Sequence, residues 1–354
     1  MQKICYQNAN ILSLQSGELH FCDILVEDGK FVDFGKFGKL NCEKVDLNGG
    51  IVLPSFVNLF CHSENAFKKT YGEEKAQKLS KQDQKTAVKE LMKLKNILAG
   101  AVIFNDVADC ENKAEVIENF GDFDEKSLSN LSENLAKNKL RPFARAGLDL
   151  CELGTVDKTF KNPLSNVLED FGILDRKPTI VGGNCFEKDE LSLLKQYDCD
   201  FCLTPSEDGK FGRRPTNFVT LRHLGFDVGI GSGYSFEVDF FGFMRQILMN
   251  QRGLFEDKNC VTEQEVLRLA TTCGAKILLG KSNEIEKGSD ADFFVLENTN
   301  SLYDDIFKTI VWEKSKKDVV LSVKNGEILQ KNGKIVGKNL PSYDKIILTL
   351  NGAK

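Results

Sequence analysis

Short runs rich in β-branched and aromatic residues alternate with stretches of helical pattern along the middle of the chain, from about residue 51 to residue 287. The β-rich runs lie at 101–106, 142–147, 179–183, 201–205 and 227–231, and the helical stretches lie at 83–98, 126–137, 187–196 and 240–249. Parallel strands need a crossover connection, usually a helix, so this alternation predicts a parallel sheet. Over a segment of this length the natural solution is a TIM-type α/β barrel, which takes about 250 residues.

The two ends of the chain follow a different pattern, with short alternating β-rich runs separated by turn dipeptides. Asp28-Gly29, Asn325-Gly326 and Asn332-Gly333 are typical of tight β-hairpins. Neither end could bury both faces of a sheet by itself, so we expect the two ends to pack together as a small composite β-sandwich. The predicted domains are therefore 1–50 with 288–354 for the sandwich, and 51–287 for the barrel.

Composition excludes several classes of partner. The 354 residues carry a formal net charge of −5, which gives no electrostatic reason to expect nucleic acid or an anionic membrane. No apolar run approaches the roughly 20 residues that span a bilayer, and the first residues lack the apolar core of a signal peptide. We therefore expect a cytoplasmic protein without a nucleic-acid or membrane partner.

Two motifs carry a family resemblance. Residues 51–62, Ile-Val-Leu-Pro-Ser-Phe-Val-Asn-Leu-Phe-Cys-His, resemble the first barrel strand of the amidohydrolase superfamily, Pro-Gly-Phe-Val-Asn-Ala-His-Thr-His. Residues 261–276 and 285–296 are similar to the segments by which that family leaves the barrel for the sandwich. The likeness is closest to the aminohydrolase branch of deaminases and chlorohydrolases. It implies metal-dependent hydrolysis of a carbon–nitrogen bond in a cyclic or nucleoside-like substrate.

Several positions depart from the family pattern. Phe60 stands where the resemblance implies the first metal-binding histidine, Gly182 where it implies a catalytic histidine, and Gly233 where it implies a metal-binding aspartate. His62 matches the second histidine, and Asp208 matches an asparagine of the family motif. We therefore predict a pocket at degenerate ligand positions formed by Phe60, Gly182 and Gly233.

The chain has three histidines, and the other two lie away from this pattern: His20 in the β-rich N-terminal region and His223 in a helix before the eighth strand. A catalytic zinc site takes three protein ligands and an open position. We therefore expect no cofactor, with His62 as a remnant of the metal site. Zinc or iron would be the metal if other side chains, such as the thiols of Cys110, Cys151 and Cys185, rebuild the centre.

His62 and Asp208 are the candidate catalytic residues, because a pocket imidazole or carboxylate can transfer protons without a metal. The structural alternatives are a hydrogen-bonded remnant for His62 and helix capping or loop solvation for Asp208.

The spacing of the strands also bears on the barrel. The runs at 142–147 and 179–183 resemble the third and sixth strands of the family, yet we find one helical segment between them, ending near Phe171. Two strand–helix units would then be deleted or collapsed. Both a complete barrel and one short of two units remain open.

The function expected from these residues is that of a deaminase-type hydrolase that is metal-depleted and weakly active or inactive. The alternative is a pseudoenzyme that binds a small heterocyclic or nucleoside-like molecule, or that serves as the partner subunit of an active homologue. A homodimer and a complex with such a homologue are the assemblies left open.

Overall fold

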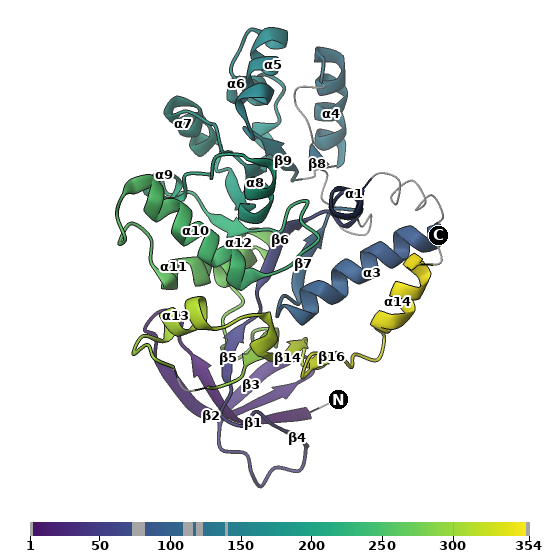
Figure 1. Cartoon of the computed structure of the whole chain (residues 1–354), viewed down its shortest axis with the longest axis vertical. Coiled ribbons are helices and arrows are strands. Elements are labelled where there is room, and N and C mark those ends of the chain that lie inside the picture. The colour runs from purple at the N-terminus through teal and green to yellow at the C-terminus, as the bar shows by residue number, and fades with distance from the viewer. Residues whose placement is uncertain are drawn as a thin grey trace.

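The computed structural model describes residues 3–72, 82–108, 116–117, 123–138, 141–299 and 301–351. The two ends of the chain form a β-sheet layer, and the middle of the chain forms parallel strands with helices around them (Figure 1). The described helices include none that is both long enough and apolar enough to cross a bilayer.

The terminal layer is one hydrogen-bonded sheet of nine strands, in the order β16-β15-β14-β13-β5-β1-β2-β3 with β4 paired to β1. Its strands are β1 (Lys3–Leu12), β2 (Leu19–Glu27), β3 (Lys30–Gly35), β4 (Glu43–Asp46), β5 (Ile51–Pro54), β13 (Phe293–Leu296), β14 (Val319–Lys324), β15 (Glu327–Lys331) and β16 (Lys334–Ile335). The two ends of the chain meet where β13 pairs antiparallel with β5. Ile51–Pro54, which we expected at the start of the first barrel strand, therefore belongs to this sheet.

The sheet folds around a core of its own. The ring of Phe293 lies 5.1 Å from the ring of Tyr6 and 5.7 Å from that of Phe31, and the Tyr6 hydroxyl donates a hydrogen bond of 3.0 Å to the carbonyl of Gly326. The predicted turns at Asp28-Gly29, Asn325-Gly326 and Asn332-Gly333 have positive φ at both residues, as type I′ hairpin turns require. The two ends thus share one continuous ladder of hydrogen bonds.

The barrel strands are all parallel and form two groups, β6-β7 and β12-β11-β10-β9-β8. They are β6 (Val57–Cys61), β7 (Ile103–Asp106), β8 (Val116–Ile117), β9 (Phe143–Ala146), β10 (Thr179–Gly182), β11 (Asp200–Leu203) and β12 (Val228–Ile230). A parallel bridge between Cys61 and Gly233 joins the two groups. The first strand therefore lies beside the last, as in a barrel.

The order of the strands corrects the expected deletion. β9 and β10 are adjacent, with Phe143 opposite Thr179. Counted back from β12 as the eighth strand, β9 holds the fifth place and β8 the fourth. Among the described residues one place, between β7 and β8, therefore has no strand, where the sequence predicted two collapsed units. A strand of two residues is too short to show the alternation on which sequence-based prediction depends.

The helices are α1 (Ser63–Tyr71), α3 (Gln82–Leu98), α4 (Glu125–Asn138), α5 (Leu150–Phe160), α6 (Leu164–Asp170), α7 (Lys188–Gln196), α8 (Pro205–Phe211), α9 (Phe218–His223), α10 (Phe240–Phe255), α11 (Glu263–Arg268), α12 (Gly274–Leu279), α13 (Ile306–Lys308) and α14 (Tyr343–Asn351). The four predicted helices are present as α3, α4, α7 and α10. Two helices, α5 and α6, connect β9 to β10 where we expected one. The C-terminal helix α14 packs against α3 (Figure 1).

Candidate functional site

The carboxyl ends of β6 and β12 bring together three of the positions singled out in the sequence. The backbone N–H of Gly233 donates to the carbonyl of Phe60 over 3.0 Å, and that of His62 donates to the carbonyl of Gly233 over 3.3 Å. The side chain of Asn58 bonds Ser232 in both directions, at 2.9 and 3.1 Å. Active sites of α/β barrels lie at this end of the strands, which we call the mouth.

A buried ion pair occupies the mouth. Arg145 lies on β9, two residues after Phe143 and on the same face, and the ring of Phe143 is 5.9 Å from that of Phe60. The guanidinium of Arg145 donates two hydrogen bonds to the carboxylate of Glu207 on α8, at 2.6 and 3.1 Å. The side chains of Arg145 and Glu207 are 4% and 0% exposed, so the pair is removed from solvent.

Glu207 has two further donors. Arg213 bonds one carboxylate oxygen at 2.8 Å, and the backbone N–H of Tyr234 bonds the other at 2.8 Å. Burial by itself would raise the pKa of Glu207, but the charge and hydrogen bonds of Arg145, with those of Tyr234 and Arg213, outweigh it and hold the pKa below its ordinary value. Glu207 is therefore an anion that holds two arginine side chains.

Two aromatic rings lie close to the Arg145 guanidinium. Its central carbon lies 3.9 Å from the centroid of the Tyr234 ring and 5.9 Å from that of Phe60. The planes of the two rings are inclined by 30°, and their centroids are 6.4 Å apart. Such cation–π contacts are strongest where water is excluded. Phe60, at the position of the expected histidine, therefore lies near a fixed cation.

The backbone conformation and the neighbouring atoms at Gly182 and Gly233 leave no room for a side chain. Gly233 has φ +60°, and a Cβ there would lie 2.1 Å from the nearer carboxylate oxygen of Glu207. Gly182 has φ +98°, and a Cβ there would lie 2.4 Å from Leu148 Cδ2. Side chains at 182 and 233 are thus excluded both by the backbone conformation and by neighbouring atoms.

His62 is the N-cap of α1. Its Nδ1 accepts a hydrogen bond of 3.3 Å from the backbone N–H of Asn65, and the Tyr234 ring lies edge-on to the imidazole at 5.5 Å. The Nδ1 lone pair is therefore committed to the helix. This capping contact matches the structural alternative, and a proton-transfer role for His62 stays a prediction.

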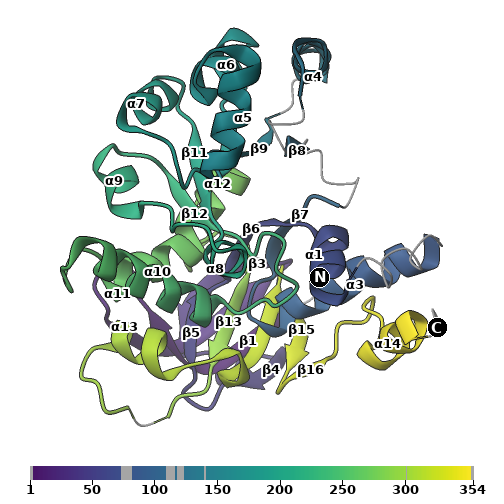
Figure 2. The ribbon, with the colours of Figure 1, turned by 45° about the horizontal axis from the view of Figure 1, so that its top comes forward.

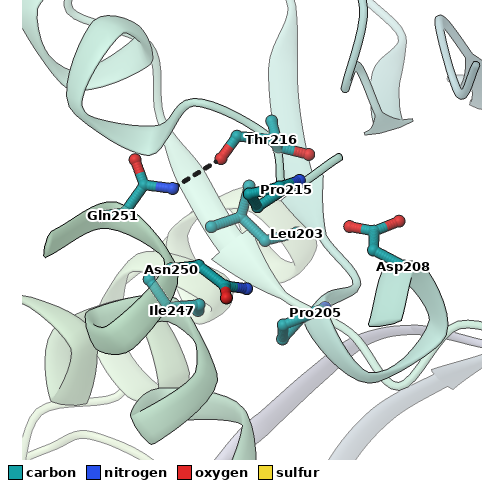
Figure 3. Close-up of a pocket in the computed structure, with 8 residues that line it drawn as sticks. All are labelled: Leu203, Pro205, Asp208, Pro215, Thr216, Ile247, Asn250 and Gln251. Atoms are coloured by element: carbon teal, nitrogen blue, oxygen red, sulfur yellow. Dashed lines mark hydrogen bonds between the residues drawn. The ribbon is translucent and has the colours of Figure 1, made fainter. Parts of the chain in front are cut away.

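Asp208 is 4% exposed and lies on α8 beside a small pocket, together with Leu203, Pro205 and Thr216 (Figure 3). The free volume of this pocket is about 10 Å³, which is roughly what one water molecule needs. Burial raises the pKa of Asp208 to about 7. One of its carboxylate oxygens has no hydrogen-bond partner among the described residues.

A second carboxyl near the mouth behaves in the same way. Glu152 on α5 accepts a hydrogen bond of 2.7 Å from the backbone N–H of Leu148, and burial raises its pKa to about 7. Asp149 caps α5 by accepting from the backbone N–H of Glu152 at 2.9 Å.

Few of the side chains at the mouth are of the kinds that bind metal ions. In the part of the chain that the structure describes, no three His, Cys, Asp or Glu side chains are grouped so that they could hold an ion. His20 and His223 are exposed. Of the thiols that could have rebuilt a centre, Cys151 is exposed, Cys185 is buried, and Cys110 lies outside the described residues.

Sequence reasoning missed Arg145 and Glu207, although one signal was available. Arg145 interrupts the apolar run Phe-Ala-Arg-Ala, and an arginine inside a buried strand requires a partner. Nothing in the sequence identifies which carboxylate that partner is, since the two residues are 62 positions apart.

Comparison with known proteins supports the resemblance. Residues 164–335 match the model of the Amidohydrolase family. The chain is similar to a 5-methylthioadenosine/S-adenosylhomocysteine deaminase of Bacillus cytotoxicus, at 24% identity over 190 residues that cover 51% of this chain and 44% of that protein. A relative of the same name from Bacillus cereus is 25% identical over 46% of this chain and 39% of its own length. The matched part thus spans less than half of these relatives.

Solved structures show the same fold over nearly the whole chain. An adenosine deaminase from Xanthomonas campestris with bound zinc superposes with a TM-score of 0.85 at 12% identity, covering 99% of this chain and 98% of that one. A mutant of the atrazine chlorohydrolase of Arthrobacter aurescens, complexed with zinc and atraton, has a TM-score of 0.81 at 17% identity and covers all of both chains. The predicted TIM-type fold is confirmed.

Proposed function

We propose, on the premise that this chain is a member of the amidohydrolase superfamily, that it derives from hydrolases of carbon–nitrogen bonds and holds a buried ion pair in place of their metal centre. It would then be weakly active or inactive as a hydrolase. The observation that carries this proposal is the position of the Arg145–Glu207 ion pair, which lies near the Phe60 and Tyr234 rings and occupies the space that a side chain at 233 would need.

The residues at the mouth do not fit a divalent cation. A hydrolytic metal site needs three or four ligands and an open position for the water that it activates. Here Glu207 accepts from three different residues, so it offers no uncommitted oxygen. Two arginine cations adjoin that carboxylate, and they would repel a second positive centre. The Nδ1 of His62 is used by α1.

The names of the relatives indicate which substrates to test. Deaminases of 5-methylthioadenosine, S-adenosylhomocysteine and adenosine are among the similar proteins. A purine nucleoside needs far more room than the pocket beside Asp208, whose free volume is about 10 Å³. The pocket beside Asp208 is therefore not where such a substrate would bind.

Metal analysis combined with an ammonia-release assay tests the proposal. The full chain would be incubated with zinc or ferrous iron, desalted, and assayed with 5-methylthioadenosine, S-adenosylhomocysteine, adenosine and guanine beside an active deaminase. We expect substoichiometric metal and no ammonia above the blank. One equivalent of zinc or iron, with ammonia release that a chelator abolishes, would overturn the proposal.

A further inference from the structure

A second pocket lies at the end of the barrel opposite the mouth. It has a volume of about 460 Å³ and is lined by residues at the amino ends of the parallel strands, such as Asp200, the first residue of β11, and Asp227, just before β12. Helices α7 and α12 complete it, and Figure 2 shows how these elements lie around the strands. The volume falls within the range of small-molecule sites, about 300–1,000 Å³.

Most residues that line this pocket are charged, and the cationic side chains outnumber the carboxylates. Its cationic side chains are Arg141, Arg176, Lys177, Lys195 and Lys276, and its carboxylates are Asp198, Asp200 and Asp227. The pocket therefore has two positive charges in excess, although the whole chain carries a net charge of −5. A concave surface of one sign concentrates the field that attracts an oppositely charged ligand.

The pairing inside the pocket shows which cations are uncompensated. Each carboxylate has one partner: Arg141 with Asp200, Lys177 with Asp198 at 3.0 Å, and Lys276 with Asp227 at 2.7 Å. Lys195 donates instead to a neutral group, the carbonyl of Gly225, at 2.6 Å. The half-buried guanidinium of Arg176 has no hydrogen bond or ion pair with the described residues. The excess charge is thus located on Arg176 and Lys195.

We propose that this pocket binds the phosphate group of a small molecule, with Arg176 and Lys195 as its principal contacts. A guanidinium presents a planar fork of donors that matches two phosphate oxygens, while an ammonium group acts as a compact charge. The excess of two positive charges matches a phosphate monoester, which carries about −1.5 to −2 at pH 7. The volume leaves room for the remainder of a phosphate ester. This site is independent of the mouth and of its proposed loss of metal.

Titration calorimetry of the full chain tests the site, with inorganic phosphate, adenosine 5′-monophosphate and acetate as probes at low ionic strength. We expect saturable binding of the phosphate probes, weakened by salt, and no comparable binding of acetate. Tighter binding of the monophosphate would identify a phosphate ester as the occupant, and equal binding would identify free phosphate. Both results support a phosphate site.

The Arg176→Gln variant should bind the phosphate probes at least about tenfold more weakly, which corresponds to the loss of one charge-assisted hydrogen bond. Arg214→Gln is the matched control, because Arg214 is exposed and does not line this pocket. Thermal unfolding should change little in Arg176→Gln, since the Arg176 side chain has no hydrogen bond or ion pair with the described residues to lose. Absence of saturable binding, equal binding of acetate, or an unchanged affinity in Arg176→Gln would overturn the proposal.

Discussion

Replacement of Glu207 by Gln tests whether the ion pair in the mouth is as tightly enclosed as its geometry indicates. The carboxylate accepts two hydrogen bonds from Arg145, one from Arg213 and one from the backbone of Tyr234. A neutral amide leaves the Arg145 guanidinium, 4% exposed, as an uncompensated buried charge. Removing one partner of a buried pair costs about 3–5 kcal/mol, a large part of the roughly 5–15 kcal/mol of a typical protein.

A double variant separates the effect of the uncompensated charge from the effect of the lost hydrogen bonds. In Arg145→Met/Glu207→Gln the more deeply buried of the two arginines is absent, and Arg213 keeps the Asp149 carboxylate at 3.8 Å. The amide oxygen introduced at position 207 can still accept from the backbone N–H of Tyr234. We therefore expect the double variant to be more stable than Glu207→Gln alone. Glu27→Gln is the matched control, because Glu27 pairs with Lys3 at 2.9 Å with both side chains about one third exposed. Exposed pairs contribute about 1 kcal/mol or less.

Urea denaturation followed by circular dichroism measures these free energies of unfolding by linear extrapolation. If Glu207→Gln lowers the free energy of unfolding by no more than Glu27→Gln does, the reasoning is refuted. Arg145→Met is measured alone as well. A double variant whose loss equals the sum of the losses in Arg145→Met and Glu207→Gln would also refute the reasoning, because additivity means that the two residues do not interact.

Two further predictions concern the surroundings of this pair. Gly233→Ala should lower the free energy of unfolding by roughly 2 kcal/mol or more, since its Cβ would lie 2.1 Å from Glu207 Oε2 at φ +60°. Gly253→Ala, in α10 with no atom within 4 Å of the added Cβ, should have no destabilising effect in the same urea assay. Asp208 has a folded-state pKa raised to about 7, so the native state binds more protons than the unfolded state between about pH 4 and 7, and stability should fall as pH rises through that window. Asp208→Asn should remove about 4 kcal/mol of that pH-dependent loss. Other buried carboxyls whose pKa is raised, among them Glu152, contribute to the slope that remains. A stability–pH profile that is the same for both proteins would show that Asp208 is ionised as easily in the folded state as in the unfolded one.

Much of the architecture could be predicted from local patterns. Strand–helix alternation indicated the parallel strands and helices α3, α4, α7 and α10, and paired turn residues such as Asn325-Gly326 marked the hairpins of the terminal sheet. The boundaries were less certain. Ile51–Pro54 and Val57–Cys61 form one apolar run in the sequence, and whether such a run enters one sheet or two depends on the partners that each half finds.

The residues of the mouth could likewise be predicted from the sequence only in part. The sequence by itself identified Phe60, Gly182 and Gly233 as residues that could not supply the ligands that the family resemblance implies at those positions. What fills the space was decided by the tertiary structure alone, because β9 and α8 come together only when the strands assemble and bring Arg145 to Glu207. A local pattern records the identity of each side chain and its neighbours in the chain. An ion pair between distant residues depends on packing, which no single segment contains.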